Sequence, residues 1–536
     1  MKAPDFIAPA IFILISVVAY VLQKNRYSWR NVFSLDKKAF WLVSSLSLIM
    51  LGISAETGQI FSGIIYQRGL WGLWFIWVAG LGAGLLPLVF AGLWARMGFI
   101  TDNQFLLFRF SGKGARVLHK FRAIYVGLFV IAILLSFQLV AFSRILSYFI
   151  GIPANQALLI SGLLLMIFSL KNTYQAKLYS DVLNFILFFG SFLVAFVYLW
   201  WQSGGISTAL TIVATHSPER LQTFPASDAR EMWNALWVFL GIQWWSTQIL
   251  DGSGPEAQRF VNTRGKWGPL KAGLLPIFIQ AAISFLMVIF ILMGMSLELH
   301  LPHMAQTYDP ESMYAGFFAE FLPTGLKGLA LVGFFAAFIT TAEGRLNWGA
   351  SFLMVDLYKQ YYRPAESEKH YVVLSFGVMV LLSLLAMFFA WWGGNLQFLF
   401  RLVFSIGAGV GPVFVLRWFW LRINAWSQLS AMISSGVYAM GFLALSNYVP
   451  SFEPWLLSQL SLDLYSAQIL CVTLLTTFTW LAVTFLTPPD SAECLEDFRN
   501  IMPAAKTRNR NLAWAMAVGV LVFLTYLAML LVLGKS

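Results

Sequence analysis

The chain is a close succession of long apolar segments, and this pattern restricts its fold more than any other feature. A transmembrane helix needs about 20 apolar residues, and about fourteen segments here reach spanning length. They lie near 5–23, 40–63, 70–95, 124–150, 155–170, 177–201, 232–250, 270–296, 323–350, 370–392, 396–420, 427–447, 467–487 and 512–533. Because backbone groups in lipid must pair within their own segment, these segments are predicted to be helices. The sequence therefore predicts an all-α polytopic membrane protein with the lipid bilayer as its main partner.

The positive charge is arranged in a way that favours membrane topology over nucleic-acid binding. The net charge is +11, but most of the 35 Lys and Arg residues lie in every second loop. Basic groups occur at 24–38, 96–122, 259–271, 359–369 and 499–510. Lys171 and Lys177 are assigned to the loop after the fifth span, and Arg417 and Arg422 to the loop after the eleventh. This is the positive-inside pattern. It predicts cytoplasmic basic loops, both termini outside, a bacterial cytoplasmic (inner) membrane and no nucleic-acid partner.

Two spans are interrupted by residues that weaken helices. The second carries Gly52 to Gly58 at its middle, and the seventh ends in the run 251–255, Asp-Gly-Ser-Gly-Pro. Gly lowers helix stability and Pro removes a backbone donor. Freed backbone groups at membrane depth persist where they line a cavity or a ligand. Gly is also common at helix contacts in membranes, but two breaks five spans apart favour inverted repeats that each open on a broken helix.

The ninth span holds polar groups that lipid does not explain. Thr340 and Thr341 are adjacent hydroxyls within the apolar run 333–350, and Glu343, Arg345 and Asn347 follow. Hydroxyl oxygens and freed carbonyls are hard ligands that can replace the water shell of Na⁺. The alternative is that both hydroxyls bond back to carbonyls one turn earlier, as helical Thr often does. The residues alone leave both interpretations open.

Several motifs resemble the sodium:solute symporter family over nearly the whole chain. They are Ile53-Ser54-Ala55-Glu56, Leu93-Trp94-Ala95-Arg96, Ser180-Asp181-Val182, Gln258-Arg259, Ala337-Phe338-Ile339-Thr340-Thr341, Asp356-Leu357-Tyr358-Lys359 and Gly409-Val410-Gly411-Pro412. The resemblance implies a single transporter domain, 1–536, built on ten core helices in two inverted five-helix repeats, 40–201 and 232–420, with broken first and sixth core helices. It leaves one extra helix before the core, 5–23, and three after it, 427–533.

The resemblance also implies a sodium site. Thr340 and Thr341 take the places of the family's paired hydroxyls, and the carbonyls of Met50, Ile53 and Ala337 would complete the shell. Asp181 is expected nearby. Thr in place of Ser keeps the hydroxyl oxygen and adds a methyl group, so we expect a changed affinity.

The solute site is expected between the two broken helices. Its candidate lining residues are Thr57, Gly58, Gln243, Trp244, Ser246, Gln248 and Asp251. Trp244 could stack on a planar or sugar-like face, although Trp in membrane proteins is more often interfacial. Asp251 could pair with an amine or cap a helix. The run Trp74 to Trp77 lacks the acid of the family's sugar transporters, which argues against galactose-like binding.

Three charged residues near the break and the paired threonines are interpreted separately. Glu343 and Arg345 lie one turn beyond Thr340 and Thr341, where a gate or a helix–helix ion pair is plausible and the ion pair is favoured. Glu56 lies at the unwound point. It could face the cavity or bond to a neighbouring helix, and a protonatable Glu56 would permit proton coupling.

The sequence predicts a Na⁺-coupled symporter that imports a small organic solute. No Walker motif, nucleophile elbow or spaced Cys/His set is present, so we expect no enzyme activity, no organic cofactor and no metal besides sodium. Alternatives are a proton-coupled transporter, a transporter-like solute sensor and a channel. A monomer or weak oligomer is expected.

Overall fold

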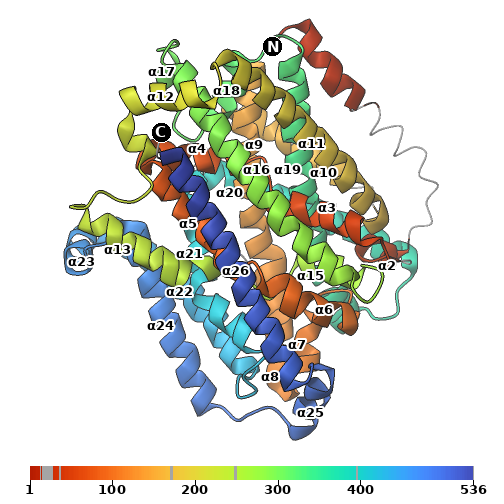
Figure 1. Ribbon diagram of the computed structural model, residues 1–536. Coiled ribbons are helices and arrows are strands. Elements are labelled where there is room, and N and C mark those ends of the chain that lie inside the picture. The colour runs from red at the N-terminus through yellow and green to blue at the C-terminus, as the bar shows by residue number, and fades with distance from the viewer. Residues whose placement is uncertain are drawn as a thin grey trace.

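Almost every described segment of the chain is helical. The computed structural model describes residues 1–12, 14, 28–35, 38–169, 173–246, 250–393 and 396–534. Within these ranges the only strand-like contact is an isolated bridge between Ala39 and Thr263. The predicted N-terminal span 5–23 lies largely outside the described residues, where only Ala3–Phe12 and residue 14 are seen as helix. The predicted all-α class is confirmed for the described part (Figure 1).

Nine helices of the described part are long and apolar enough to cross a membrane. They are Leu70–Met97 (η2 to α6), Gly112–Ile150 (α8, η5 and α9), α11 (Tyr174–Gln202), α16 (Gly268–Glu298), Leu326–Tyr362 (α19, Leu326–Ser351, with η8), α20 (Glu368–Gly393), α22 (Ala425–Tyr448), α24 (Leu464–Leu486) and α26 (Ala505–Gly534). Shorter apolar helices include α10 (Ala154–Ser169), α12 (Ile206–His216) and part of α21 (Leu396–Leu416). The predicted membrane-spanning architecture is supported, and the count of fourteen stays a prediction.

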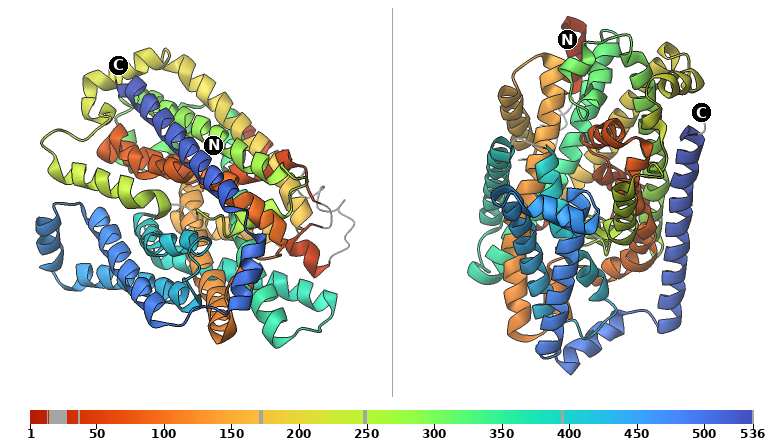
Figure 2. Two further views of the ribbon diagram at one scale, coloured as in Figure 1. Left: turned by 60° about the horizontal axis from the view of Figure 1, so that its bottom comes forward. Right: turned by 90° about the vertical axis from the view of Figure 1, so that its left-hand side faces the viewer.

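Side-chain caps fix where several of these helices begin. Thr173, Asn424 and Asp463 precede α11, α22 and α24, and each accepts a hydrogen bond from the backbone N–H three residues later. Such caps satisfy donors that the first helical turn leaves unpaired. The long helices pack side by side, and α26 lies along the outside of the bundle (Figure 2).

The first break divides one span into two short helices. α3 (Trp41–Gly52) and α4 (Thr57–Arg68) meet at an angle of 41°, with residues 53–56 between them. The pair makes a tenth crossing if it counts as one span. The interruption predicted from the sequence is therefore present at the predicted place.

The second break is longer. α13 (Arg230–Val238), η7 (Phe239–Gln243) and α14 (Trp244–Ser246) form one arm, and α15 (Pro255–Val261) follows the break. Gly252 and Gly254 have φ angles of +69° and +121°, a region that favours glycine. Residues 247–249 lie outside the described part, so the break is seen only from residue 250 onwards.

α19 is the central helix and places the candidate site in the interior. It packs against α9, α11 and α3, as Figure 1 shows. Its contact with α11 is close: a Cβ on Gly333 would lie 1.9 Å from Ser191 Oγ. Between Ala330 and Ser351 every residue of α19 is buried except Arg345. The helix therefore carries its polar residues through protein and not along lipid.

Two basic residues assigned to loops are buried in the structure, which corrects the sequence interpretation. Lys177 lies within the first turn of α11 and is 3% exposed. Arg417 directly follows α21 and has no exposed surface. Each lies beside carboxylates that compensate its charge in the interior.

Candidate functional site

The first half of the site consists of two carbonyl groups that have lost their helical donors. In a continuous helix Ser54 N would donate to Met50 O, but it donates to Thr57 Oγ1 at 3.0 Å. Likewise Thr57 N donates to Ser54 O at 3.1 Å and not to Ile53 O. The break thus leaves Met50 O and Ile53 O without the partners that a helix supplies. Carbonyls of this kind can coordinate a cation.

The second half lies on α19. Thr341 Oγ1 donates to Ala337 O at 2.6 Å and contacts Phe338 O at 3.2 Å. Thr340 Oγ1 accepts a hydrogen bond from Asn184 Nδ2 at 2.8 Å. Both threonines are buried. The back-bond weighed in the sequence analysis is present for Thr341, but it uses the hydroxyl hydrogen and leaves oxygen lone pairs for a cation.

The two halves approach each other closely. Leu51, between the two freed carbonyls, lies against Gly344 of α19, where an added Cβ would be 2.8 Å from Leu51 Cδ2. On the opposite side of α3, Gln280 Nε2 donates to Leu48 O at 3.4 Å and to Ile49 O at 3.2 Å. Gln280 thus holds the last turn of α3 in place before the break.

Asp181 takes part in a buried ion pair beside the site. Its Oδ2 accepts a short hydrogen bond from Ser47 Oγ and lies 3.5 Å from Arg259 Nη2. Arg259 Nε also donates to Ser47 Oγ at 3.0 Å. Asp181 and Arg259 are fully buried, and Asp181 Oδ1 has no hydrogen-bond partner among the described residues. This triad ties α3, α11 and α15 together.

Sequence reasoning missed two polar residues that contact the candidate ligands. Lys177 Nζ donates to Thr340 O at 3.4 Å, and Asn184 donates to the Thr340 hydroxyl. Lys177, Asp181 and Asn184 are spaced i, i+4 and i+7, so they share one face of α11. That polar periodicity was visible in the sequence and could have identified this face.

A second charged group lies one helical turn further along α19. Arg345 Nη1 is 3.9 Å from Glu56 Oε1 and donates to Leu134 O at 3.3 Å. Glu256 also acts electrostatically on Arg345. The Arg345 side chain is 23% exposed, whereas that of Glu56 is 4% exposed. Glu56 Oε2 has no hydrogen-bond partner among the residues that the structure describes. The helix–helix ion pair favoured for Arg345 joins it to Glu56.

The candidate solute residues are distributed over two separate places. Thr57 caps the break through Ser54 N, and an added Cβ on Gly58 would lie 2.1 Å from the Tyr314 ring. On the other arm, Ser246 Oγ donates to Gln243, and Trp244 packs edge-on against Trp245. Among the described residues no hydrogen bond or ring contact joins the two groups. Gln248 lies outside the described residues.

Within the second arm, Gln243 keeps unused hydrogen-bonding capacity. Its Oε1 accepts hydrogen bonds from Ser246 Oγ at 3.0 Å and Tyr465 OH at 3.2 Å, while Nε2 has no partner in the described part of the chain. The side chain is fully buried. Gln243 can therefore donate to a solute without first breaking a bond.

The Asp251 carboxylate is fully engaged in contacts within the protein. Its Oδ2 accepts hydrogen bonds from Arg417 Nη2 at 2.6 Å and Trp418 Nε1 at 2.8 Å, and its Oδ1 accepts one from Ser253 N at 3.0 Å. Trp94 Nε1 donates to Asp251 O at 2.6 Å. These contacts fasten the second break to the end of α21.

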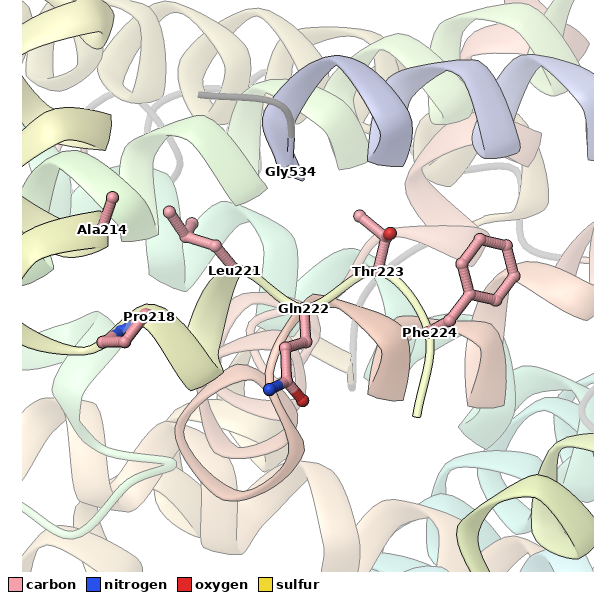
Figure 3. A pocket seen from close by; sticks show the side chains of 7 residues that line it. All are labelled: Ala214, Pro218, Leu221, Gln222, Thr223, Phe224 and Gly534. Carbon is pink, nitrogen blue, oxygen red and sulfur yellow. The ribbon is translucent and has the colours of Figure 1, made fainter. Parts of the chain in front are cut away.

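A separate surface cavity of about 410 Å³ lies beside the end of α26 (Figure 3). It is lined by residues of α12, the segment 218–224 and Gly534. None of these residues belongs to the candidate site, and no charged side chain lines the cavity. It therefore offers no feature that identifies a ligand.

Comparisons with known proteins identify relatives and a similar fold. The "Sodium/glucose cotransporter" of Vibrio parahaemolyticus is 23% identical over 88% of this chain and 90% of its own length. The "Sodium/pantothenate symporter" of Escherichia coli is 23% identical over 87% of this chain and 97% of its own length. A solved structure of a Na⁺-coupled sialic acid symporter in a substrate-bound outward-open state matches with a TM-score of 0.70 at 18% identity, covering 91% of this chain and 98% of that one.

A family model also matches the chain. The model of the sodium:solute symporter family matches residues 36–435, which include both breaks, α11 and α19. The match covers well over half of the chain. The chain belongs to the sodium:solute symporter family, and its relatives are transporters in membranes.

Proposed function

We propose that this protein imports a small organic solute together with Na⁺ by alternating access. The observation that carries the proposal is the pair of carbonyls, Met50 O and Ile53 O, that have lost their helical donors beside the buried hydroxyls of Thr340 and Thr341. With Ala337 O they make five oxygens, the hard ligand type that suits Na⁺. Sodium is here a transported ion, and it would tie the first broken helix to α19.

Asp181 acts in this proposal through its neighbours. Its charge is compensated by Arg259, and Ser47 holds its position. The Lys177 ammonium lies on the Thr340 carbonyl, so it fixes the turn that presents both hydroxyls. We assign Asp181, Lys177 and Asn184 to positioning α19 and not to direct contact with the ion.

The same proposal includes the domain plan and the topology. Residues 40–201 and 232–420 are two inverted repeats, and the broken helices open each of them, five spans apart. Residues 5–23 and 427–533 lie outside the repeats. The basic loops face the cytoplasm of a bacterial cell, both termini are outside, and the protein works as a monomer or weak oligomer.

Several contacts support an inward-facing state. The segment before α19 covers the far side of α4: Tyr314 lies on Gly58, and Ser62 Oγ donates to Pro310 O at 2.7 Å. Arg144 Nη1 also donates to Glu311 Oε2 at 2.8 Å. That segment is predicted to be external. Arg345 lies on the other side of the site and is the one residue of the buried stretch 330–351 that is partly exposed, as expected if that side is open.

The solute is proposed to bind beside the breaks, next to Thr57, Gly58, Gln243, Trp244, Ser246 and Gln248. Gln243 Nε2 is buried and has no partner within the described ranges, which supports this place. Asp251 has a positioning function, because its carboxylate is engaged by Arg417, Trp418 and Ser253.

The test is uptake into proteoliposomes of proline, glucose, myo-inositol, pantothenate and other labelled solutes. An inward Na⁺ gradient at equal pH on both sides should drive accumulation, and Thr341→Ala should abolish it. Thr341→Ser, which retains the oxygen, is the matched control and should transport. Accumulation that requires a pH gradient and ignores Na⁺ would contradict the proposal. It would favour the second candidate, proton coupling through Glu56, whose Oε2 is buried and has no partner in the part of the chain that the structure describes.

A further inference from the structure

Arg345 is a cation inside the bundle whose surroundings leave part of it available to a ligand. It is the one partly exposed residue in the otherwise buried stretch 330–351 of α19, with 23% of its side chain accessible. Its hydrogen bond to Leu134 O at 3.3 Å uses one of five guanidinium donors. The Glu56 carboxylate is 3.9 Å away, which is an ion pair without a hydrogen bond. Such a guanidinium can bind an anionic group by donating two parallel hydrogen bonds to it.

Glu56 provides the complementary charge at the first break. It is 3% exposed, and its Oε2 has no partner among the described residues. A buried carboxylate oxygen without a donor is costly, so a ligand or water with a donor group should occupy the place beside it. Glu56 follows Ile53 by three residues and thus lies within about one turn of a proposed sodium ligand.

Gln138 adds a neutral group to the same region. It lies one turn from Leu134 on α9 (Ile131–Ile150), and Leu134 O accepts the bond from Arg345. Gln138 is fully buried, and neither of its amide atoms has a partner among the described residues. Gln138 thus lies about one helical turn from the carbonyl that Arg345 contacts, and Arg345, Glu56 and Gln138 all retain bonding capacity.

The charges around Arg345 indicate the net charge of the ligand. Glu256, whose carboxylate would lie 3.3 Å from a Cβ on Gly254, acts on Arg345 together with Glu56. With the adjoining buried groups included, the cluster holds four carboxylates and three cations, and a sodium ion in the neighbouring site balances its net charge of minus one. The groups counted are Glu56, Glu256, Asp181 and Glu343 against Arg345, Arg259 and Lys177. A further net charge would then lie uncompensated in a medium where charges are costly. The solute that fits best is electrically neutral.

We propose that Arg345, Glu56 and Gln138 form the inner end of the solute site and that the solute is a zwitterion. The anionic group of the solute binds Arg345, and its cationic group binds Glu56 Oε2. Gln138 forms a hydrogen bond to a further polar group of the solute. This inference rests on the proposed function and adds the substrate class. A neutral polyol would meet the charge balance but would leave both charged groups without charge-assisted bonds.

The experiment measures melting temperature of the purified full chain in NaCl and in KCl. The probes are the proteinogenic amino acids without charged side chains, glycine betaine and taurine as neutral zwitterions, glucose and myo-inositol as neutral polyols, pantothenate as an anion and choline as a cation. A bound ligand raises the melting temperature by mass action. We expect a Na⁺-dependent shift with at least one zwitterion and none with the other classes.

Variants connect the shift to the proposed residues. Arg345→Gln and Glu56→Gln should each weaken zwitterion binding by about tenfold to a hundredfold, the loss expected for one charge-assisted hydrogen bond. Arg345→Lys keeps the charge and should bind more tightly than Arg345→Gln. Arg68→Gln, which breaks a partly exposed pair with Asp463, is the control and should bind as the wild type does. Size-exclusion profiles verify that each variant is folded.

The outcomes separate the inference from the proposed function. Binding of a polyol, pantothenate or choline with Na⁺, or failure of every zwitterion, overturns the zwitterion site and leaves Na⁺ coupling standing. Zwitterion binding that both Gln variants retain also overturns it, because the pair would then be a structural contact only. If Na⁺ shifts neither the melting temperature nor solute binding in the wild type, the proposed function itself fails.

Discussion

The buried contact between Asp251 and Arg417 yields a prediction that can be worked out from the structure. Asp251→Ala removes the carboxylate and leaves the Arg417 guanidinium fully buried without its counter-ion. Breaking a buried pair in this way costs about 3–5 kcal/mol. Arg417→Met should cost a similar amount, because it leaves the Asp251 charge buried instead.

The double variant should be less destabilised than the sum of the two single variants. With both charges gone, the remaining loss is four hydrogen bonds of about 1 kcal/mol each: those that Trp418 Nε1 and Ser253 N make to Asp251, and those that Arg417 makes to Ser253 Oγ and Gln428 Oε1. The double variant should therefore lose about 4 kcal/mol, and the coupling energy should exceed about 2 kcal/mol. Both residues lie in one network, where such non-additivity is expected.

Reversible unfolding in mixed micelles with increasing SDS, followed by tryptophan fluorescence, measures these energies. Additive single effects would refute the reasoning, because they would mean that the two side chains do not depend on each other. Solute binding gives a second readout. The double variant should retain Na⁺-dependent solute binding if Asp251 only positions the break, and should lose it if Asp251 binds the solute.

Three further predictions follow from close contacts and one pKa. Gly333→Ala should destabilise the protein by about 1–3 kcal/mol through overpacking against Ser191 Oγ, and Ser191→Ala should recover part of the loss in the same SDS titration. Gly58→Ala should displace Tyr314 from α4 and so expose Ser62. Ser62→Cys in that background should then react faster with an impermeant thiol reagent than Ser62→Cys alone. Equal rates would contradict the proposal that Tyr314 and its segment cover the outer side of α4. Burial and, to a smaller extent, the Asp490 carboxylate raise the pKa of the Cys494 thiol, which lies in the segment between α24 and α26. Alkylation of Cys494 in a Cys471→Ser background should therefore still accelerate as the pH rises above 9, because the thiolate is the reactive form. Asp490→Asn removes one of these causes and should speed alkylation at pH 8.

Much of the helical layout follows from hydropathy, because lipid admits only segments that pair their own backbone groups. The predicted span 467–487 corresponds to α24, Leu464–Leu486, and 427–447 to α22, Ala425–Tyr448. The breaks were equally readable: Gly254 and Pro255 lie where a helix cannot continue. These features are local in sequence and need no knowledge of tertiary contacts.

The parts that the sequence did not predict depend on partners far along the chain. Lys177 and Arg417 were placed in loops because a charge lowers hydropathy, and only the fold brings Arg417 to Asp251, 166 positions away. Asn184 was overlooked although its spacing from Asp181 places both on one helix face. The ion pair of Arg345 was foreseen as a type of contact, but Glu56 as its partner required the break to be folded against α19.

The central claim is that Na⁺ binds between the first break and α19. Equilibrium binding of ²²Na⁺ to the purified protein tests it most directly, with wild type, Thr341→Ala and Thr341→Ser compared at fixed ionic strength in K⁺. The account predicts saturable binding to the wild type and to Thr341→Ser, and its loss in Thr341→Ala. Binding to Thr341→Ala with the wild-type affinity, or no saturable binding to the wild type, would contradict it.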